Sequence, residues 1–211
     1  MKWTLIACLA FGLVGCSSAP KIAEAPKEPV KAQPAPAQFN ALFDTSKGKF
    51  TIEVHREWAP MGADRFYELI QDKFFDDARF FRVVRNFVVQ FGINGNPKLS
   101  EVWRQLKLVD DPVRQSNRRG TITFATAGPG TRTTQMFINL TNNTMLDQQG
   151  FAPFGKVVDG MSVVDSFYAG YGDMSPQGPG PDPTRIEVQG NEYLTSHYER
   201  LDYIKTARVQ P

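Results

Sequence analysis

The segment from Phe80 to Gly92 places one arginine, Arg82, among aromatic and β-branched side chains. Valine and phenylalanine at this density predict a strand in which Arg82 and Val84 share one face. A guanidinium group is charged at any physiological pH and carries five N–H donors, so its burial without an acceptor would be costly. Arg82 therefore either pairs with a carboxylate, such as Asp76 or Asp77, or has a function.

Short strand patterns recur along the chain, separated by glycine and proline turns. Residues 50–55 alternate between apolar and polar, and similar short strands are expected near residues 122–124, 136–138, 154–158 and 185–188. Fewer segments have the period of a helix: Pro60 to about Asp72, Met161 to Tyr168, and Asn191 to Thr206. Pro97 to Arg118 is expected to be an extended connection. Together these patterns predict a mainly β fold, a closed or nearly closed β-barrel with helices packed against it.

The first sixteen residues carry both cysteines and have the pattern of a secretion signal. A basic start precedes the uncharged run from Trp3 to Val14, which is too short to span a bilayer. The sequence Leu-Val-Gly-Cys ending at Cys16 resembles the lipobox of bacterial lipoproteins, which implies lipidation of Cys16, including palmitate. Ser17 in the next position implies the outer membrane. The alternative is an ordinary signal peptide with a chance cysteine.

Residues 17–38 are rich in proline and alanine and have too few large apolar side chains to bury anything, so they are expected to form a tether. We therefore expect a signal peptide at 1–15, a lipidated cysteine and tether at 16–40, and a folded domain at 41–211.

Composition excludes several classes of function. Lysine and arginine number 24 against 22 acidic residues, spread along the chain, which argues against a nucleic-acid partner. The expected domain has no cysteine and two histidines, so neither a zinc site nor a nucleophilic triad is predicted, and no cofactor is expected. The stretch Gly178-Pro179-Gly180-Pro181 is interpreted as a loop, since it lacks the residues of a phosphate-binding loop.

A second informative block is Gly120 to Thr131, followed by Gln135 to Asn139. With the motifs at 81–84, 87–90 and 154–161, this block resembles the cyclophilin family of peptidyl-prolyl cis-trans isomerases, in family order and at near-family spacing from about Phe43 to Val188. The resemblance implies a closed eight-stranded antiparallel β-barrel capped by two α-helices, with an active groove on its outer surface. The predicted helix beyond Gly190 would be an extra C-terminal helix.

The resemblance also implies roles for individual residues. Arg82 would be catalytic, and Gln90 would bind the substrate backbone. The other substrate-binding residues would be Phe87, Val88, Ala125, Thr126, Gln135, Phe137, Met145, Leu146 and Phe151. Several positions depart from common members of the family: Phe81 replaces a histidine, Met145 a tryptophan, Val88 a methionine and Thr126 an asparagine, and Phe151 lies near the place of a pocket histidine. The groove is therefore expected to be more apolar than in well-known members.

The function implied is rotation of X-Pro bonds in envelope proteins, which would assist their folding without a metal. The expected partners are proline-containing segments of those proteins and, through Cys16, the membrane; the chain is expected to act as a monomer facing the periplasm. The alternative is a membrane-tethered peptide-binding or chaperone module with little turnover. A structural lipoprotein would leave the groove motifs unexplained.

Overall fold

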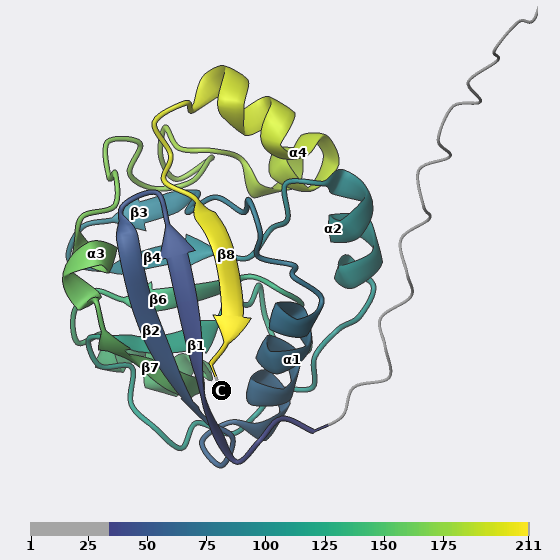
Figure 1. Ribbon diagram of the computed structural model, residues 1–211. Coiled ribbons are helices and arrows are strands. Elements are labelled where there is room, and N and C mark those ends of the chain that lie inside the picture. Colours follow the sequence, from purple (N-terminus) through teal and green to yellow (C-terminus); the bar gives the residue numbers. More distant parts are fainter. Residues whose placement is uncertain (1–33, 211) are drawn as a thin grey trace, which may run out of the picture.

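The computed structural model of the chain describes residues 34–210 (Figure 1). The expected signal peptide, Cys16 and most of the expected tether lie outside the described residues. The first strand begins at Gln38, slightly before the expected start of the domain at residue 41, and the preceding segment is held against a helix by the bond from Ala35 N to Asp64 Oδ1, at 2.9 Å. Among the described residues, no helix has both the length and the apolar character needed to cross a membrane.

A single sheet of eight antiparallel strands forms most of the fold, in the order β3-β4-β6-β5-β7-β2-β1-β8. The strands are β1 (Gln38–Thr45), β2 (Gly48–His55), β3 (Arg82–Val84), β4 (Val88–Phe91), β5 (Thr121–Phe124), β6 (Met136–Asn139), β7 (Pro153–Asp159) and β8 (Ile204–Val209). The mainly β prediction, with eight antiparallel strands, is therefore confirmed.

The sheet curls, so that its two end strands approach each other (Figure 1). They are joined beside their ends by a bridge between Arg79 and Tyr203, and by the hydrogen bond from Ile204 N to Ala78 O at 2.9 Å. This contact lies before the first residue of β3, and no register pairs β3 with β8 in residues 34–210. The structure is therefore a curled half-barrel, and full closure is not confirmed.

Two of the predicted helices are present, at slightly different lengths. Helix α1 (Pro60–Gln71) agrees with the prediction, and α3 (Met161–Asp165) is shorter than expected. The backbone N–H groups at the start of α1 are capped from a distance: Met61 N and Gly62 N donate to the carboxylate of Asp111 at 3.1 and 2.8 Å. Because no residue next to α1 caps it through its side chain, this remote carboxylate satisfies donors that the helix leaves free.

The segment Pro97–Arg118 is not wholly extended, contrary to expectation. It contains α2 (Pro97–Arg104), which begins with Asn96 accepting a hydrogen bond from Lys98 N and with a proline in the first turn. Trp103 of this helix is 3% exposed and packs edge-on against Phe74, with ring centroids 5.8 Å apart. The buried indole shows that α2 belongs to the core.

The prediction was wrong for the region beyond residue 183. The expected strand at 185–188 is the first half of α4 (Pro183–His197), and the expected helix 191–206 ends at His197. Alternating apolar residues over four positions also fit a helix, and Asp182 caps this one by accepting a hydrogen bond from Thr184 N at 2.8 Å. Residues 204–209 form β8 instead, because Ile204 and Ala207 are buried against β1.

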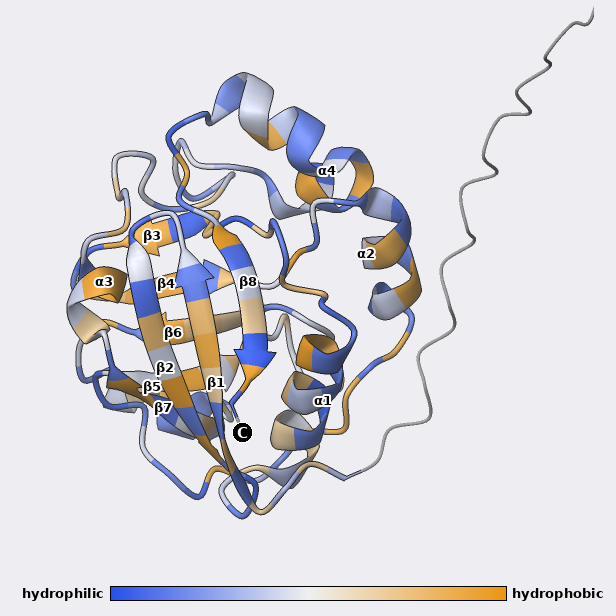
Figure 2. Ribbon diagram, in the orientation of Figure 1, coloured by the Kyte–Doolittle hydropathy of each residue, from blue (hydrophilic) through white to orange (hydrophobic). Residues whose placement is uncertain are grey.

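Phenylalanine dominates the core enclosed by the sheet and α1. Figure 2 shows apolar residues along β1, β2, β6 and α1. Ten of the sixteen phenylalanines are fully buried, and many contact each other, for example Phe43 and Phe50 with centroids 5.0 Å apart. Burying an aromatic side chain contributes roughly 2–3 kcal/mol. This core gives the outer face of the sheet a stiff support.

Candidate functional site

Strand alternation places the candidate residues on the outer face of β3, β4 and β6. Val83, Val89 and Ile138 point into the core, so their neighbours in each strand point outward. The register sets Arg82 opposite Gln90, and Gln90 opposite Phe137. Three residues from separate motifs are therefore brought side by side, as the resemblance implied.

Arg82 is held by three residues from two parts of the chain. Its Nε and Nη2 donate to the two carboxylate oxygens of Asp173, at 2.7 and 3.3 Å, and Nη1 donates to Gln90 Oε1 at 2.9 Å. The guanidinium carbon also lies 5.4 Å from the centroid of the Phe87 ring. Arg82 is thus both paired and placed at the surface of the candidate site, with 16% of its side chain exposed.

The carboxylates proposed from sequence as partners of Arg82 are engaged elsewhere. Asp76 pairs with Arg208 of β8, at 2.7 Å, and Asp77 pairs with Arg79 at 2.5 Å. Both aspartates lie beside the joint between the sheet's two ends, whereas Arg82 points to the outer face. The true partner is 91 residues away, in the loop that leads to α4.

A separate apolar cluster lies beside Arg82. It consists of Val88, Phe137 and Leu146, all at most 7% exposed, and of the partly buried Phe87, Ala125 and Phe151. Leu146 comes from a 3-10 helix, Thr144–Gln149, and the Phe151 ring meets Phe137 edge-on at 5.5 Å between centroids. Six of the predicted substrate-binding residues are therefore adjacent in space. Met145 is 57% exposed and lies outside this cluster.

A hollow adjoins the cluster, on the other side of Ala125. Its volume is about 370 Å³, and Gln90, Ala125, Thr126 and Gln135 line it together with residues of α2, α4 and their loops. Gln90 Nε2 donates to Gln135 Oε1 at 3.1 Å, and Gln135 Nε2 donates to Glu187 Oε1 at 3.4 Å. Burial raises the pKa of Glu187, although Arg104 and Gln135 act in the opposite direction. The two glutamines thus link Arg82 to α4.

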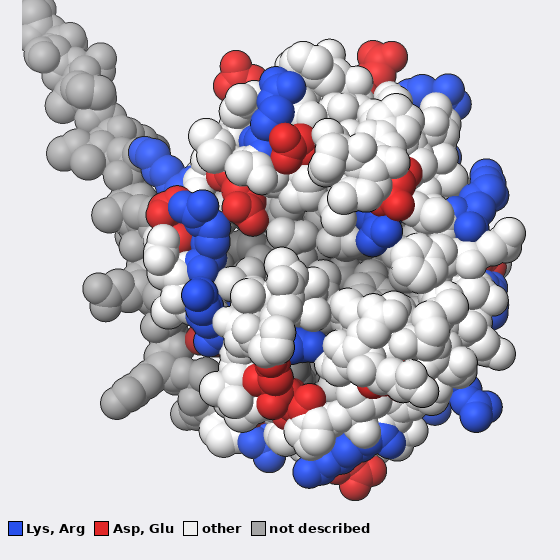
Figure 3. Space-filling view, turned by 180° about the vertical axis from the view of Figure 1, so that it is seen from behind, with Lys and Arg blue, Asp and Glu red and all other residues white. Residues whose placement is uncertain are grey.

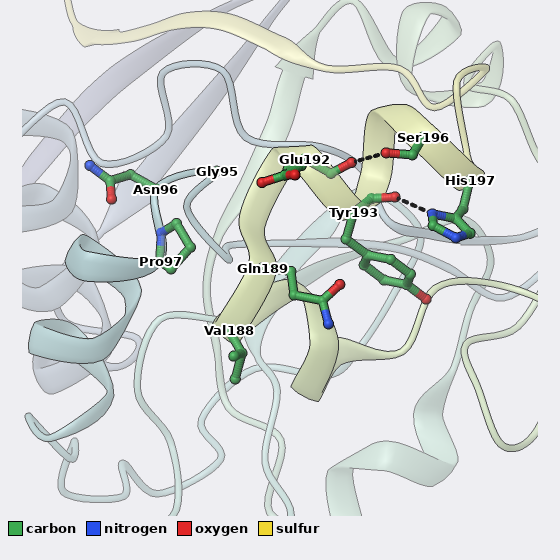
Figure 4. Close-up of a pocket in the computed structure, with 9 residues that line it drawn as sticks. All are labelled: Gly95, Asn96, Pro97, Val188, Gln189, Glu192, Tyr193, Ser196 and His197. Atoms are coloured by element: carbon green, nitrogen blue, oxygen red, sulfur yellow. Dashed lines mark hydrogen bonds between the residues drawn. The ribbon is translucent and has the colours of Figure 1, made fainter.

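A larger hollow lies elsewhere, between the start of α2 and α4 (Figure 4). Its volume is about 700 Å³, and polar residues such as Asn96, Gln189 and Glu192 form much of its lining. None of the predicted site residues borders it. The predicted catalytic and substrate-binding residues lie around Arg82. We therefore place the functional site there, although the hollow beside it is smaller than the one between α2 and α4.

Sequence reasoning missed a buried polar network below the apolar cluster. Asn117 is fully buried, and its Nδ2 donates to Asp147 Oδ1 and to the carbonyl of Phe151, both at 2.8 Å. Its Oδ1 accepts hydrogen bonds from Thr123 and Asn139, at 3.0 and 3.2 Å. Because Phe151 and Leu146 flank Asp147, this network fixes one wall of the cluster. No local sequence signal marks it, since its members come from separate segments.

The face that carries β3, β4 and β6 lies behind β1 and β2 in Figure 1. Seen from behind, it shows mostly uncharged atoms around a central hollow, and most of its Lys, Arg, Asp and Glu side chains lie toward the rim (Figure 3). Within residues 34–210, no group of three or more His, Cys, Asp or Glu side chains could hold a metal ion. The face is suited to a largely neutral ligand.

Comparison with protein families matches residues 41–187 to the family described as cyclophilin type peptidyl-prolyl cis-trans isomerase/CLD. A peptidyl-prolyl cis-trans isomerase of Acinetobacter baylyi is 33% identical, in an alignment covering 57% of this chain and 67% of the relative. Peptidyl-prolyl cis-trans isomerase A of Dickeya dadantii is also 33% identical, covering 62% of this chain and 72% of the relative.

Among solved structures, a cyclophilin type peptidyl-prolyl cis-trans isomerase of Cryptosporidium parvum aligns with a TM-score of 0.59 and 17% identity, covering 82% of this chain and 98% of the other. This likeness supports the fold, and the family match extends over 147 of the 211 residues. The chain therefore belongs to the cyclophilin-type peptidyl-prolyl cis-trans isomerases and is an enzyme of that family.

Proposed function

We propose that Arg82 is the catalytic group of the isomerase and that the cluster beside it holds the proline ring. The observation that carries the proposal is the hydrogen bonding of Arg82. Asp173 and Gln90 engage three of its five N–H groups, and in the described part of the chain one N–H remains on each of Nη1 and Nη2. These two donors are available to a substrate.

The barrier to rotation about an X-Pro bond is about 18–20 kcal/mol, because twisting breaks amide resonance. In the twisted state the proline nitrogen regains its lone pair, so a donor directed at that nitrogen stabilises the transition state more than the ground state. Arg82 would supply this donor from a fixed position, which requires little reorganisation during the reaction. No covalent bond forms or breaks.

The remaining residues would position the peptide. Val88, Phe137 and Leu146 offer an apolar surface for the pyrrolidine ring, in contact with Phe87 and Phe151. Gln90 and the strand edge at Ala125 would bind the neighbouring main chain, so that one side of the bond is held while the other turns. Thr126 would contribute through its backbone, because its hydroxyl is occupied by Gly128 O and Thr131.

The test compares Arg82→Ala with Arg85→Ala in a protease-coupled assay on a proline-containing tetrapeptide. Arg85 is an exposed arginine three residues away, so it is a matched control for loss of charge. We expect Arg82→Ala to lose most of kcat/KM with an unchanged circular dichroism spectrum, and Arg85→Ala to retain it. Equal activity of wild type and Arg82→Ala would refute the catalytic role of Arg82, and a wild type without turnover would leave peptide binding as the function of the site.

We also propose that the enzyme acts on envelope proteins, anchored to the bacterial outer membrane through a lipid on Cys16 and facing the periplasm. The support is the lipobox-like sequence ending at Cys16 and the proline-rich segment that follows it. Expression of wild type and Cys16→Ser in a bacterial host, followed by membrane fractionation and mass spectrometry of the N-terminal peptide, tests this. Unmodified wild type in the soluble fraction would contradict it.

A further inference from the structure

We propose that the loop at residues 169–182 is part of the active site, and that its Asp173 is a positioning residue for Arg82. The inference rests on the proposed role of Arg82 and extends it to a residue outside the motifs of the sequence analysis. Asp173 is the one charged residue in the stretch from Ala169 to Pro181, which otherwise consists of small, uncharged and proline residues. The structure pairs this isolated charge with Arg82.

The contact between the two side chains fixes the plane of the guanidinium group. Asp173 binds along the edge that carries Nε and Nη2, with Oδ1 2.7 Å from Nε and Oδ2 3.3 Å from Nη2. An arginine held through two parallel hydrogen bonds has little freedom to rotate. Gln90 fixes Nη1 from a third direction, so the remaining N–H groups have one defined orientation.

The loop in turn fixes Asp173. Its Oδ1 accepts a hydrogen bond from Met174 N, and its backbone carbonyl accepts one from Gly180 N, both at 2.8 Å. A Cβ atom at Gly178 or at Gly180 would lie 2.6 Å from that carbonyl oxygen, closer than side chains approach. The two glycines therefore let the chain return beneath Asp173. The Gly-Pro-Gly-Pro stretch, which has no role as a phosphate-binding loop, here serves as the support of an acidic residue.

Beneath the loop lies a second apolar cluster that ties it to the strand of Arg82. Phe81, next to Arg82, is 1% exposed and packs with Ile186 and Leu194 of α4, and Tyr171 and Met174 of the loop cover this cluster. This explains the apolar residue at position 81: it anchors α4 and the loop rather than facing the substrate. The carboxylate is thus held from both sides, by its backbone and by the packing below.

Two effects of Asp173 on catalysis oppose each other. The carboxylate weakens the positive potential of Arg82, and it also holds the donors in place. Orientation dominates in this geometry, because a displacement of about 1 Å in a catalytic group can cost a factor of 100 in rate. Removal of Asp173 should therefore lower kcat by between about tenfold and a hundredfold, while KM changes little, because the interaction with Arg82 develops in the transition state.

The experiment measures kcat and KM separately for Asp173→Ala, Asp173→Asn and Asp173→Glu on the same tetrapeptide, at a temperature where circular dichroism shows each variant folded. The expected order of kcat is wild type, Glu, Asn, Ala, since glutamate keeps both charged acceptor oxygens. The control is Asp165→Asn, which removes a similar ion pair with Arg119 at 2.6 Å, exposed at about 45% on both sides. This variant should keep wild-type kinetics.

A merely structural ion pair predicts a different result. Asp173→Ala would then lower the unfolding temperature and leave kcat of the folded enzyme unchanged, which would overturn the inference. Failure of the inference is distinct from failure of the proposed function. If Arg82→Ala is inactive and Asp173→Ala is fully active, the positioning role alone is wrong; if Arg82→Ala is fully active, the catalytic assignment itself is wrong.

Discussion

Asn117→Ala is expected to be among the most damaging polar substitutions in the domain, although Asn117 touches no substrate. The side chain is fully buried and makes four hydrogen bonds, two through Nδ2 and two through Oδ1. Alanine removes all four and leaves the Thr123 hydroxyl and the Phe151 carbonyl without this partner, and Thr123 is itself fully buried.

Each of these hydrogen bonds contributes about 0.5–1.5 kcal/mol net, and each buried group left without a partner costs about 1–3 kcal/mol. Allowing for relaxation and for the other bonds of Asp147 and Asn139, we expect a loss of about 3–5 kcal/mol in the free energy of unfolding. Since domains of this kind are stable by about 5–15 kcal/mol, the variant should fold but be fragile. Without the hydrogen bond from Asn117, Phe151 should be less firmly positioned in the apolar cluster, so KM for the tetrapeptide should rise.

Urea unfolding at pH 7, followed by tryptophan fluorescence and circular dichroism, measures the loss. The matched control is Asn142→Ala: Asn142 is exposed and accepts one hydrogen bond, from Arg119 N at 3.0 Å. It should cost less than about 1 kcal/mol. A loss below about 1 kcal/mol for Asn117→Ala as well would refute the reasoning that the buried network carries this part of the structure.

Three further predictions concern Asp147, Trp103 and the pH dependence of catalysis. Burial raises the pKa of Asp147, but hydrogen bonds from Ser116 and Asn117 lower it by more, and the net shift is downward. The ionised Asp147 should therefore stabilise the fold above the unfolded pKa of about 3.9, and this stabilisation should be lost as pH falls through the lower folded pKa. The urea midpoint of unfolding should consequently fall less on acidification in Asp147→Asn than in wild type. Trp103→Ala should lower the free energy of unfolding by about 3–5 kcal/mol, measured in urea, because the indole is 3% exposed; an effect below about 1 kcal/mol would place α2 outside the core. Because Arg82 needs no proton transfer, kcat/KM should vary little between about pH 6 and 8, and a steep titration there would point to a general acid or base.

The site could be predicted from sequence where its residues belong to one sheet. Arg82, Gln90 and Phe137 lie in short strands whose alternation defines an inner and an outer face, and the family resemblance supplied a role for each of them, while the pairing between their strands comes from the structure. Asp173 and Asn117 could not be found this way. Each of them interacts with a residue far along the chain: 91 residues separate Asp173 from Arg82, and 30 separate Asn117 from Asp147. No pattern in the neighbouring sequence indicates either interaction.

The fold, like the site, could be predicted where it depends on local sequence pattern. The strands other than β1 and β8, and helix α1, follow from sequence period and from Pro60, whereas β8 was expected to be helix and α4 was misassigned because four alternating residues fit either structure. The capping of α1 by Asp111, 49 to 50 residues away, depends on tertiary structure that no window of sequence contains. Local sequence pattern identified α1 and most of the strands, and tertiary packing decides the elements that it did not identify.

The antiparallel pairing of β1 with β8 brings both ends of the described chain to one place. Ala41 lies opposite Val209, and Gln210 N donates to Asn40 O at 2.8 Å. A short linker could therefore join the two ends. A circular permutant opened at an exposed turn would keep Arg82, Gln90 and Phe137 in their present sheet. The new ends could then be placed at different turns, so that the direction in which the site faces relative to an attached linker could be varied without changing its chemistry.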